Sequence, residues 1–85
     1  MEGDENMEKA MAFVLIRTKP GHENAVYYTL AKRGEFNELH PVTGEYSMVA
    51  KVVTNDPERI GYIVRDAISK TEHVDSYETL IVTPL

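Results

Sequence analysis

The pattern of apolar and polar positions along the chain is dominated by two apolar runs that are too short for helices. Residues 12–16 are five consecutive apolar side chains, and residues 46–53 are apolar at most positions. Short runs rich in β-branched residues are typical of strands that are buried on both faces. We therefore predict strands over residues 10–18 and 46–53. In the second strand the alternation places on one face Met48, Ala50 and Val52, and on the other Val49, Lys51 and Val53.

A tight turn is predicted just before the second of these strands. Gly44 and Glu45 separate residues 36–43 from residues 46–53, and a glycine at the first central position supplies the positive φ of a two-residue hairpin turn. Residues 36–43 are more polar and contain Pro41, which has no N–H to donate to a neighbouring strand. They therefore predict an edge strand.

Two helices are predicted from apolar positions at helical spacing. The first covers residues 22–33 and ends with two basic side chains, after which Gly34 suits the residue just past a helix. The second begins after Asp56, which can cap it, with Pro57 at its first position, and it ends near residues 70–71. The buried stripes are Val26, Tyr27, Leu30 and Ala31 in the first helix, and Ile60, Ile63, Val64, Ala67 and Ile68 in the second.

A last alternating strand over residues 74–83 completes the order strand-helix-strand-strand-helix-strand. This order predicts an α+β fold of the ferredoxin-like βαββαβ type. Right-handed crossovers place both helices on one face of a four-stranded antiparallel sheet, with the first and third strands in its centre.

The other face of this sheet has no helix to cover it. Apolar residues such as Val49 and Val53 would be exposed there, and a contiguous apolar patch is uncommon on a monomer. We therefore expect a second copy to pack sheet to sheet in a dimeric α/β sandwich or barrel. The residues expected in this dimer interface are Val49, Lys51, Val53 and Glu78.

Composition and charge narrow the functional classes. The 85 residues suffice for one domain, with residues 1–9 expected as a flexible tail and residues 10–85 as the folded part. A net charge of −5 argues against direct binding to nucleic acid. The lack of cysteine excludes a disulfide scaffold and a thiolate metal site, and it is compatible with the cytoplasm. No run of apolar residues is long enough to span a membrane.

The hairpin is the strongest candidate for a small-molecule site. Backbone amides at a tight turn can hold a carboxylate, and Glu45 can pair with an ammonium group, so residues 44–47 suit a small zwitterion. The alternative is a plain hairpin without a ligand. The histidines lack the spacing of metal ligands, so we expect no metal and no cofactor at His22, His40 or His73.

Three other polar or aromatic positions each have two possible interpretations. Lys51 lies in an apolar run, where its stem can cover apolar surface or its ammonium can pair with Glu78 across a subunit boundary. Tyr28 and Tyr62 lie off the apolar stripes of their helices, so they are either partly buried rings or contacts between dimers.

Three segments give the chain a family resemblance. They are residues 12–15 followed by Lys19-Pro20-Gly21, then Val42-Thr43-Gly44-Glu45-Tyr46, and finally residues 76–82. In these segments the sequence resembles the effector-binding domain of the leucine-responsive/asparagine (Lrp/AsnC) regulators of bacteria and archaea, called the RAM domain (regulation of amino-acid metabolism). The hairpin segment is the most specific of the three, and the resemblance extends over about residues 12–82.

The resemblance implies dimers formed through the sheets, often assembled into rings, with a small molecule such as an amino acid bound where dimers meet. Carried onto matching positions, it places beside that site Thr43, Gly44, Glu45 and Tyr46. Ser47 stands where the family usually has an aspartate, and Tyr77 where it often has a threonine. Both are therefore candidate ligand-binding residues that bear on ligand choice.

Full-length regulators of that family carry a helix-turn-helix domain before this module. Only about ten residues precede the first predicted strand, so we expect the stand-alone form of the module, without a DNA-binding domain. Such a chain would bind an effector and modulate transcription by assembling with itself or with a full-length regulator. It would not itself be an enzyme.

Two other functions remain open on the sequence alone. The chain could be a small dimeric ferredoxin-like enzyme, such as a cofactor-independent oxygenase or isomerase, with His40, Tyr27 and Tyr77 as candidate residues. An apolar pocket within one subunit would favour that function. The chain could also be a purely structural assembly partner that binds no ligand.

Overall fold

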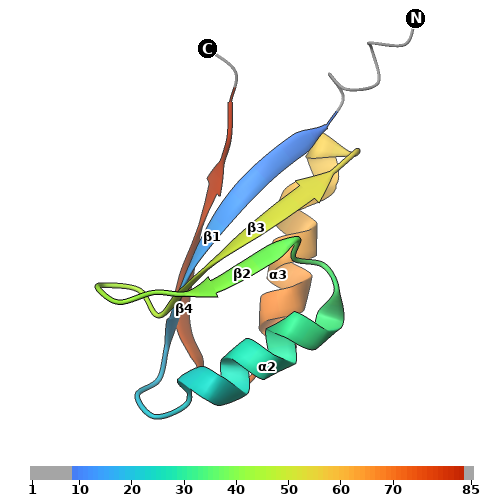
Figure 1. Cartoon of the computed structure of the whole chain (residues 1–85). Coiled ribbons are helices and arrows are strands. Elements are labelled where there is room, and N and C mark those ends of the chain that lie inside the picture. Colours follow the sequence, from blue (N-terminus) through green and yellow to red (C-terminus); the bar gives the residue numbers. More distant parts are fainter. Residues whose placement is uncertain (1–8, 84–85) are drawn as a thin grey trace, which may run out of the picture.

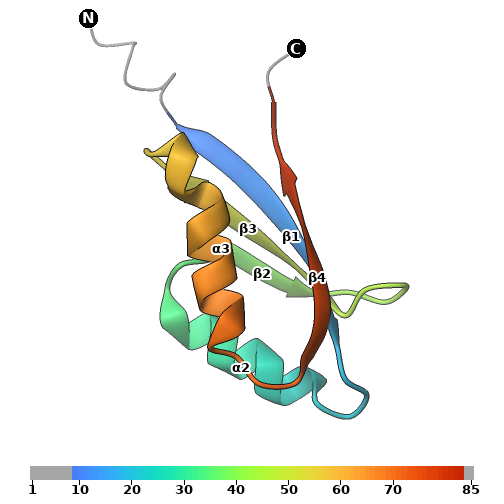
Figure 2. The same cartoon turned by 180° about the vertical axis from the view of Figure 1, so that it is seen from behind.

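The computed structural model describes residues 9–83 and contains one four-stranded sheet with two α-helices. Its elements are β1 (Ala10–Thr18), α2 (Glu23–Arg33), β2 (Glu38–Pro41), β3 (Met48–Thr54), the short 3₁₀ helix η1 (Pro57–Arg59), α3 (Ile60–Ser69) and β4 (Val74–Ile81). Neighbouring strands are antiparallel in the order β2-β3-β1-β4, with β3 and β1 in the centre. Both helices lie on one side of the sheet (Figures 1 and 2). The predicted α+β ferredoxin-like βαββαβ fold is therefore confirmed.

The alternation along β1 gives the sheet two different faces. Val14 and Ile16 are fully buried, whereas Leu15 between them is only half-buried. Residues directly opposite on antiparallel strands share a face, and Val14 stands opposite Ala50 while Leu15 stands opposite Val49. We call the side of Val14 the helix-covered face. The other side, the open face, comprises Met11, Phe13, Leu15, Val49, Lys51, Val53, Glu78 and Leu80.

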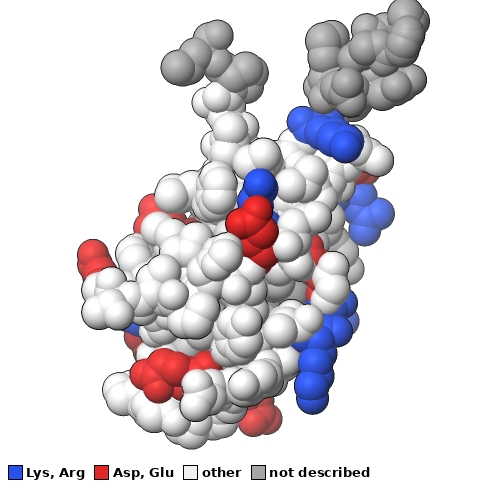
Figure 3. All heavy atoms as spheres, viewed as in Figure 1, with Lys and Arg blue, Asp and Glu red and all other residues white. Residues whose placement is uncertain are grey.

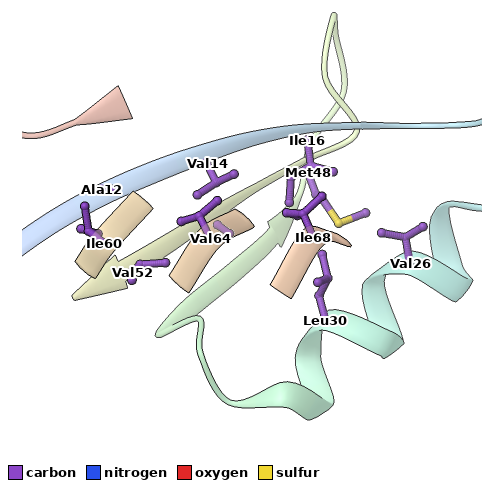
Figure 4. Packing of buried hydrophobic residues seen from close by; sticks show 11 residues of the cluster. Ala12, Val14, Ile16, Val26, Leu30, Met48, Val52, Ile60, Val64 and Ile68 are labelled. Atoms are coloured by element: carbon purple, nitrogen blue, oxygen red, sulfur yellow. The ribbon is translucent and has the colours of Figure 1, made fainter. Parts of the chain in front are cut away.

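The hydrophobic core lies between the helix-covered face and the two helices (Figure 4). Fully burying one aliphatic side chain of this kind contributes roughly 1.5–3 kcal/mol. The predicted apolar stripes of both helices are confirmed except at Ala31, and Tyr27 and Ile63 are half-buried. Ala31 is exposed because it lies beyond the edge of the contact between α2 and the sheet. The core consists of Ala12, Val14, Ile16, Val26, Leu30, Met48, Ala50, Val52, Ile60, Val64 and Ile68.

The helix ends follow the local sequence signals. Gly34 ends α2 in the left-handed conformation, with φ of 86°. The Asp56 carboxylate accepts the N–H of Glu58 at 3.2 Å, and Pro57 follows the cap as predicted. The first turn is a 3₁₀ helix, and the chain becomes α-helical only at Ile60.

Three of the four predicted strands have wrong bounds. β2 covers only Glu38–Pro41 and β3 begins at Met48, because Pro41 has no N–H and the chain beyond it leaves the ladder after one more bond. A longer loop over residues 42–47 therefore replaces the predicted two-residue turn. The pairing of β2 with β3 is still symmetric about residues 44–45, as predicted.

At the C-terminal end, β4 stops at Ile81 rather than at Thr83. As an edge strand it has only β1 as a partner, and its last bond runs from the Val82 N–H to the Met11 carbonyl at 2.9 Å. The predicted tail over residues 1–9 lies outside the described residues, apart from the exposed Lys9.

Candidate functional site

The loop that joins β2 to β3, residues 42–47, projects beyond one end of the sheet (Figure 1). Its two sides are tied by the Val42 N–H, which donates to the Ser47 carbonyl at 3.0 Å. Gly44 has φ of 138°, which few other residues adopt, so the glycine determines the shape of the tip. Thr43 and Glu45 are exposed beside it.

Arg17 at the end of β1 fastens this loop to the sheet. Its Nε donates to the Glu45 carbonyl at 3.1 Å, and one terminal nitrogen lies 3.2 Å from the Glu45 carboxylate. The other terminal nitrogen donates to Ser76 Oγ on β4 at 3.1 Å. The guanidinium carbon also lies 4.7 Å from the centre of the Tyr46 ring, a cation–π contact. One side chain therefore joins β1, the hairpin and β4.

A second contact between the hairpin and β4 is made by Tyr46. Its hydroxyl donates to a carboxylate oxygen of Glu78 at 3.0 Å. This hydrogen bond to Glu78, with burial and the nearby negative charges, raises the pKa of the Tyr46 phenol above 10.0. The phenol therefore stays neutral at physiological pH and remains a donor. We call this set the Arg17 cluster, and its members are Arg17, Glu45, Tyr46, Ser76 and Glu78.

Ser47 has a structural position at the joint between the hairpin and β1. Its N–H donates to the Ile16 carbonyl at 2.8 Å. Its hydroxyl oxygen accepts the Thr18 N–H at 3.0 Å and faces the Thr18 hydroxyl at 3.1 Å. Thr18 is buried, so this contact fixes the base of the loop rather than its exposed tip.

The candidate ligand residues do not all come together. Glu45 and Tyr46 lie in the Arg17 cluster, and Thr43 and Gly44 form the tip beside it. Tyr77 is on β4 directly opposite Ile16, which places it on the helix-covered face, away from the cluster. Sequence reasoning missed Arg17 and Ser76, which share the face of Glu78 in the observed register of β1 with β4.

The four residues predicted for a dimer interface all lie on the open face. Within its own chain Lys51 pairs with Glu38 at 3.3 Å, and Glu78 accepts the Tyr46 hydroxyl. The pairing of Lys51 with Glu78 of a second copy stays a prediction. The hydrogen bond from His40 and then that from Lys51 lower the pKa of Glu38 below 4.5. In the view of Figure 3, charged side chains lie mostly toward the margins and leave wide uncharged areas.

A cavity lies elsewhere in the molecule, away from the hairpin. It is a cleft of about 360 Å³ between α2 and the turn before β4, lined by Ala25, Thr29, Lys70, Glu72 and His73. It contains none of the three residues named for an enzyme. His40 stands opposite Val49 on the open face, whereas Tyr77 is on the helix-covered face, so the sheet separates them.

Within residues 9–83 no group of three or more histidine, cysteine, aspartate or glutamate side chains is arranged to hold a metal ion. Neither α2 nor α3 has the length and apolar character needed to cross a membrane.

The βαββαβ order, with both helices on one face of a four-stranded antiparallel sheet (Figure 1), places the chain in the ferredoxin-like class of small α+β domains. A family model described as the Lrp/AsnC ligand binding domain matches residues 11–84, and the chain therefore belongs to this family. The family is a regulatory one and is typically not enzymatic. The predicted resemblance is confirmed.

Individual relatives agree with this assignment. The chain is 35% identical over 72 residues to the HTH-type transcriptional regulator FL11 of Pyrococcus furiosus, covering 85% of this chain and 47% of the regulator. It thus spans about half the length of that relative. It is 33% identical to TTHA0845 from Thermus thermophilus, whose crystal structure superposes with a TM-score of 0.80 over 89% of this chain and 95% of that one.

A more distant structure shows the same fold. The transcriptional regulator NMB0573 from Neisseria meningitidis, solved in complex with L-Met, is 16% identical and superposes with a TM-score of 0.73. The match covers 88% of this chain and 50% of the regulator.

Proposed function

We propose that this protein is a small-molecule-binding and oligomerisation module of the Lrp/AsnC type that senses an amino acid and modulates transcription through its state of assembly. The observation that carries the proposal is the open face of the sheet. Both helices of the described chain lie on the opposite side, and Met11, Phe13 and Leu15 in the centre of the open face remain only half-buried.

A second copy is the cover that suits this face. Leu80 and Val82 at the β4 edge are 45% and 48% exposed, and they extend the apolar area beyond the central strands. A two-fold contact lets the same surface serve on both copies, and a stable interface buries about 1,200–2,000 Å² in total. The Arg17 cluster would then lie at the rim of the interface, where polar groups are common.

The hairpin supports the ligand part of the proposal. Its exposed tip presents backbone amides and the Glu45 carboxylate, which suit the carboxylate and the ammonium of an amino acid. One protein of the same fold was solved with L-Met, which agrees with this class of ligand. Because the loop is fastened to β4, a ligand at the tip is connected to the strand that borders the dimer face.

The mechanism would be linkage between binding and assembly. A ligand that contacts the hairpin where dimers meet favours the larger assembly by the difference between its affinities for the two states. The same surfaces would let the chain form mixed assemblies with a full-length regulator of the family. No contact with nucleic acid by this chain is needed for such an effect.

The test is light scattering after gel filtration, with and without each of the twenty L-amino acids. The expected mass is an even multiple of the 9.6 kDa chain, rising with one or a few amino acids. A monomer at micromolar concentration would refute the assembly. A stable dimer whose mass and melting temperature respond to no amino acid would reject the sensor and favour a purely structural assembly partner that binds no ligand.

A further inference from the structure

We propose that Arg17 and Glu45 form a clamp for the two charged groups of an α-amino acid, with Arg17 taking the carboxylate and Glu45 the ammonium. The proposal rests on the proposed function and adds to it the residue that recognises the carboxylate. Arg17 lies outside the hairpin, at the end of β1.

The two side chains already present opposite charges side by side. The terminal nitrogen of Arg17 and the Glu45 carboxylate are 3.2 Å apart, and the side chains are 36% and 77% exposed. An exposed ion pair of this kind contributes little to stability, because water screens it and both side chains lose freedom in forming it. A ligand can therefore separate the pair at low cost.

An α-amino acid carries the complementary charges on two groups bonded to the same carbon atom, the carboxylate and the ammonium. A guanidinium binds a carboxylate through two parallel N–H···O bonds, which a lysine ammonium does not reproduce. When the amino acid enters, one exposed ion pair is replaced by two, one with each end of the ligand. A simple amine or a simple acid replaces it with only one.

The surroundings hold the guanidinium in place while Glu45 turns to the ligand. Arg17 Nε is fixed by the Glu45 carbonyl and one terminal nitrogen by Ser76 Oγ, each at 3.1 Å. The Tyr46 ring lies against the guanidinium carbon at 4.7 Å. These contacts do not use the Glu45 carboxylate, so they persist when it moves, and such preorganisation favours binding.

The second carboxylate of the cluster is not available for the ammonium. Glu78 already accepts the Tyr46 hydroxyl at 3.0 Å, whereas the only side-chain partner recorded for the Glu45 carboxylate in the described chain is Arg17. The geometry therefore assigns the ammonium to Glu45. The clamp selects zwitterions over molecules that carry only one of the two charges.

The experiment compares wild type with Arg17→Gln, Arg17→Lys, Glu45→Gln and the control Arg65→Gln, an exposed arginine of α3. The probes are the twenty L-amino acids and, for the one that binds wild type best, its α-amide and its deaminated acid. Binding is measured by isothermal titration calorimetry at low salt, with circular dichroism and melting temperature as checks of folding.

Arg17→Gln is expected to weaken binding of the amino acid by about 10-fold to 100-fold and to abolish its preference over the amide. Arg17→Lys keeps the positive charge and serves as the second variant if Arg17→Gln does not fold. It should still lose most of the preference for the amino acid over its amide, because lysine lacks the planar guanidinium fork. Glu45→Gln should abolish the preference over the deaminated acid. Arg65→Gln should bind as wild type does.

Two results overturn the clamp in distinguishable ways. Wild-type affinity and selectivity in both Arg17 variants would reject the clamp and leave the proposed amino-acid sensor standing. Failure of wild type to bind any of the twenty amino acids would reject the proposed sensor, and the clamp with it.

Discussion

Lys51 on β3 and Glu38 on β2 stand directly opposite each other, and Lys51 Nζ lies 3.3 Å from a Glu38 carboxylate oxygen. The pair is set among apolar side chains of the open face, with Val49 and Val53 two residues to either side of Lys51. His40 contacts the other oxygen of the same carboxylate at 3.1 Å. Glu38 therefore balances a charge that the open face would otherwise present alone.

The pKa of Glu38 predicts how this contact depends on pH. Hydrogen bonds from His40 and Lys51 lower the pKa of Glu38 below 4.5 in the folded chain. A lowered pKa means that the contact stabilises the fold above the unfolded pKa and is lost as the pH falls through the folded pKa. Wild type should thus be more stable than Glu38→Gln at pH 7, and the difference should shrink as the pH falls below the ordinary glutamate range and through the lowered pKa of Glu38.

Urea unfolding at pH 7, 5 and 3 and at one protein concentration checks this prediction. Glu58→Gln is the matched control, because Glu58 is an exposed glutamate on η1. It should show no comparable change with pH. A difference between wild type and Glu38→Gln that is as large at pH 3 as at pH 7 would contradict the assignment.

Val49→Asp should convert the protein to a monomer. Val49 is half-buried in the centre of the open face, and two copies packed sheet to sheet would bury an aspartate there without a partner. Burying an unpaired charge costs several kcal/mol, enough to dissociate a dimer of this size. Light scattering should give the 9.6 kDa chain mass.

Tyr62→Asp separates this effect from a general one. Tyr62 is 53% exposed on α3, on the other side of the sheet, so the same charge there should leave the sheet-to-sheet dimer intact. Loss of only the larger assemblies in Tyr62→Asp would place α3 at a contact between dimers. An unchanged dimer mass in Val49→Asp would reject pairing through the open face.

Ser47→Ala should lower stability by about 1–3 kcal/mol, because it removes the acceptor of the part-buried Thr18 N–H. If Ser47 served only a ligand, the free energy of unfolding without ligand would not change. Ser69→Ala is the control, since the Ser69 hydroxyl donates to the Asp66 carbonyl at an exposed position and its loss should cost less than about 0.5 kcal/mol. Denaturant unfolding without amino acids measures both.

The features that the sequence predicted depend on chemistry within a few residues. Asp56 and Pro57 start the second helical segment and Gly34 ends the first because capping and positive φ are local requirements. The alternation in residues 46–53 predicted which side of β3 is buried, because one face of the sheet has helices and the other does not. These features identified the fold.

The Arg17 cluster could not be predicted in the same way. Arg17 and Ser76 are 59 positions apart, and their contact depends on the register of β1 with β4, which shifts between Arg17 and Thr18. The sequence predicted a two-residue turn in the hairpin. It does not show that Ser47 bonds to β1 instead of extending β3. Long-range pairing decided both outcomes.

Replacing glycine by alanine is expected to change the free energy of unfolding in opposite directions at Gly34 and at Gly61. A methyl group at either position would meet no heavy atom within 4 Å, so packing does not distinguish them. Gly34 has φ of 86°, where alanine is strained, and Gly34→Ala should lower the free energy of unfolding by about 1–2 kcal/mol. Gly61 lies within α3 with no such φ, and Gly61→Ala should raise it by roughly 0.5–1 kcal/mol.

Urea unfolding of the two variants beside wild type, at one protein concentration, measures both shifts. Gly34→Asn should recover part of the loss, because asparagine tolerates the left-handed conformation better than alanine does. If Gly34→Ala were as stable as wild type, the left-handed end of α2 would not be a requirement of the fold. Destabilisation by Gly61→Ala would show instead that the methyl group meets something outside the described chain, and a second copy packed against α3 would be the first candidate.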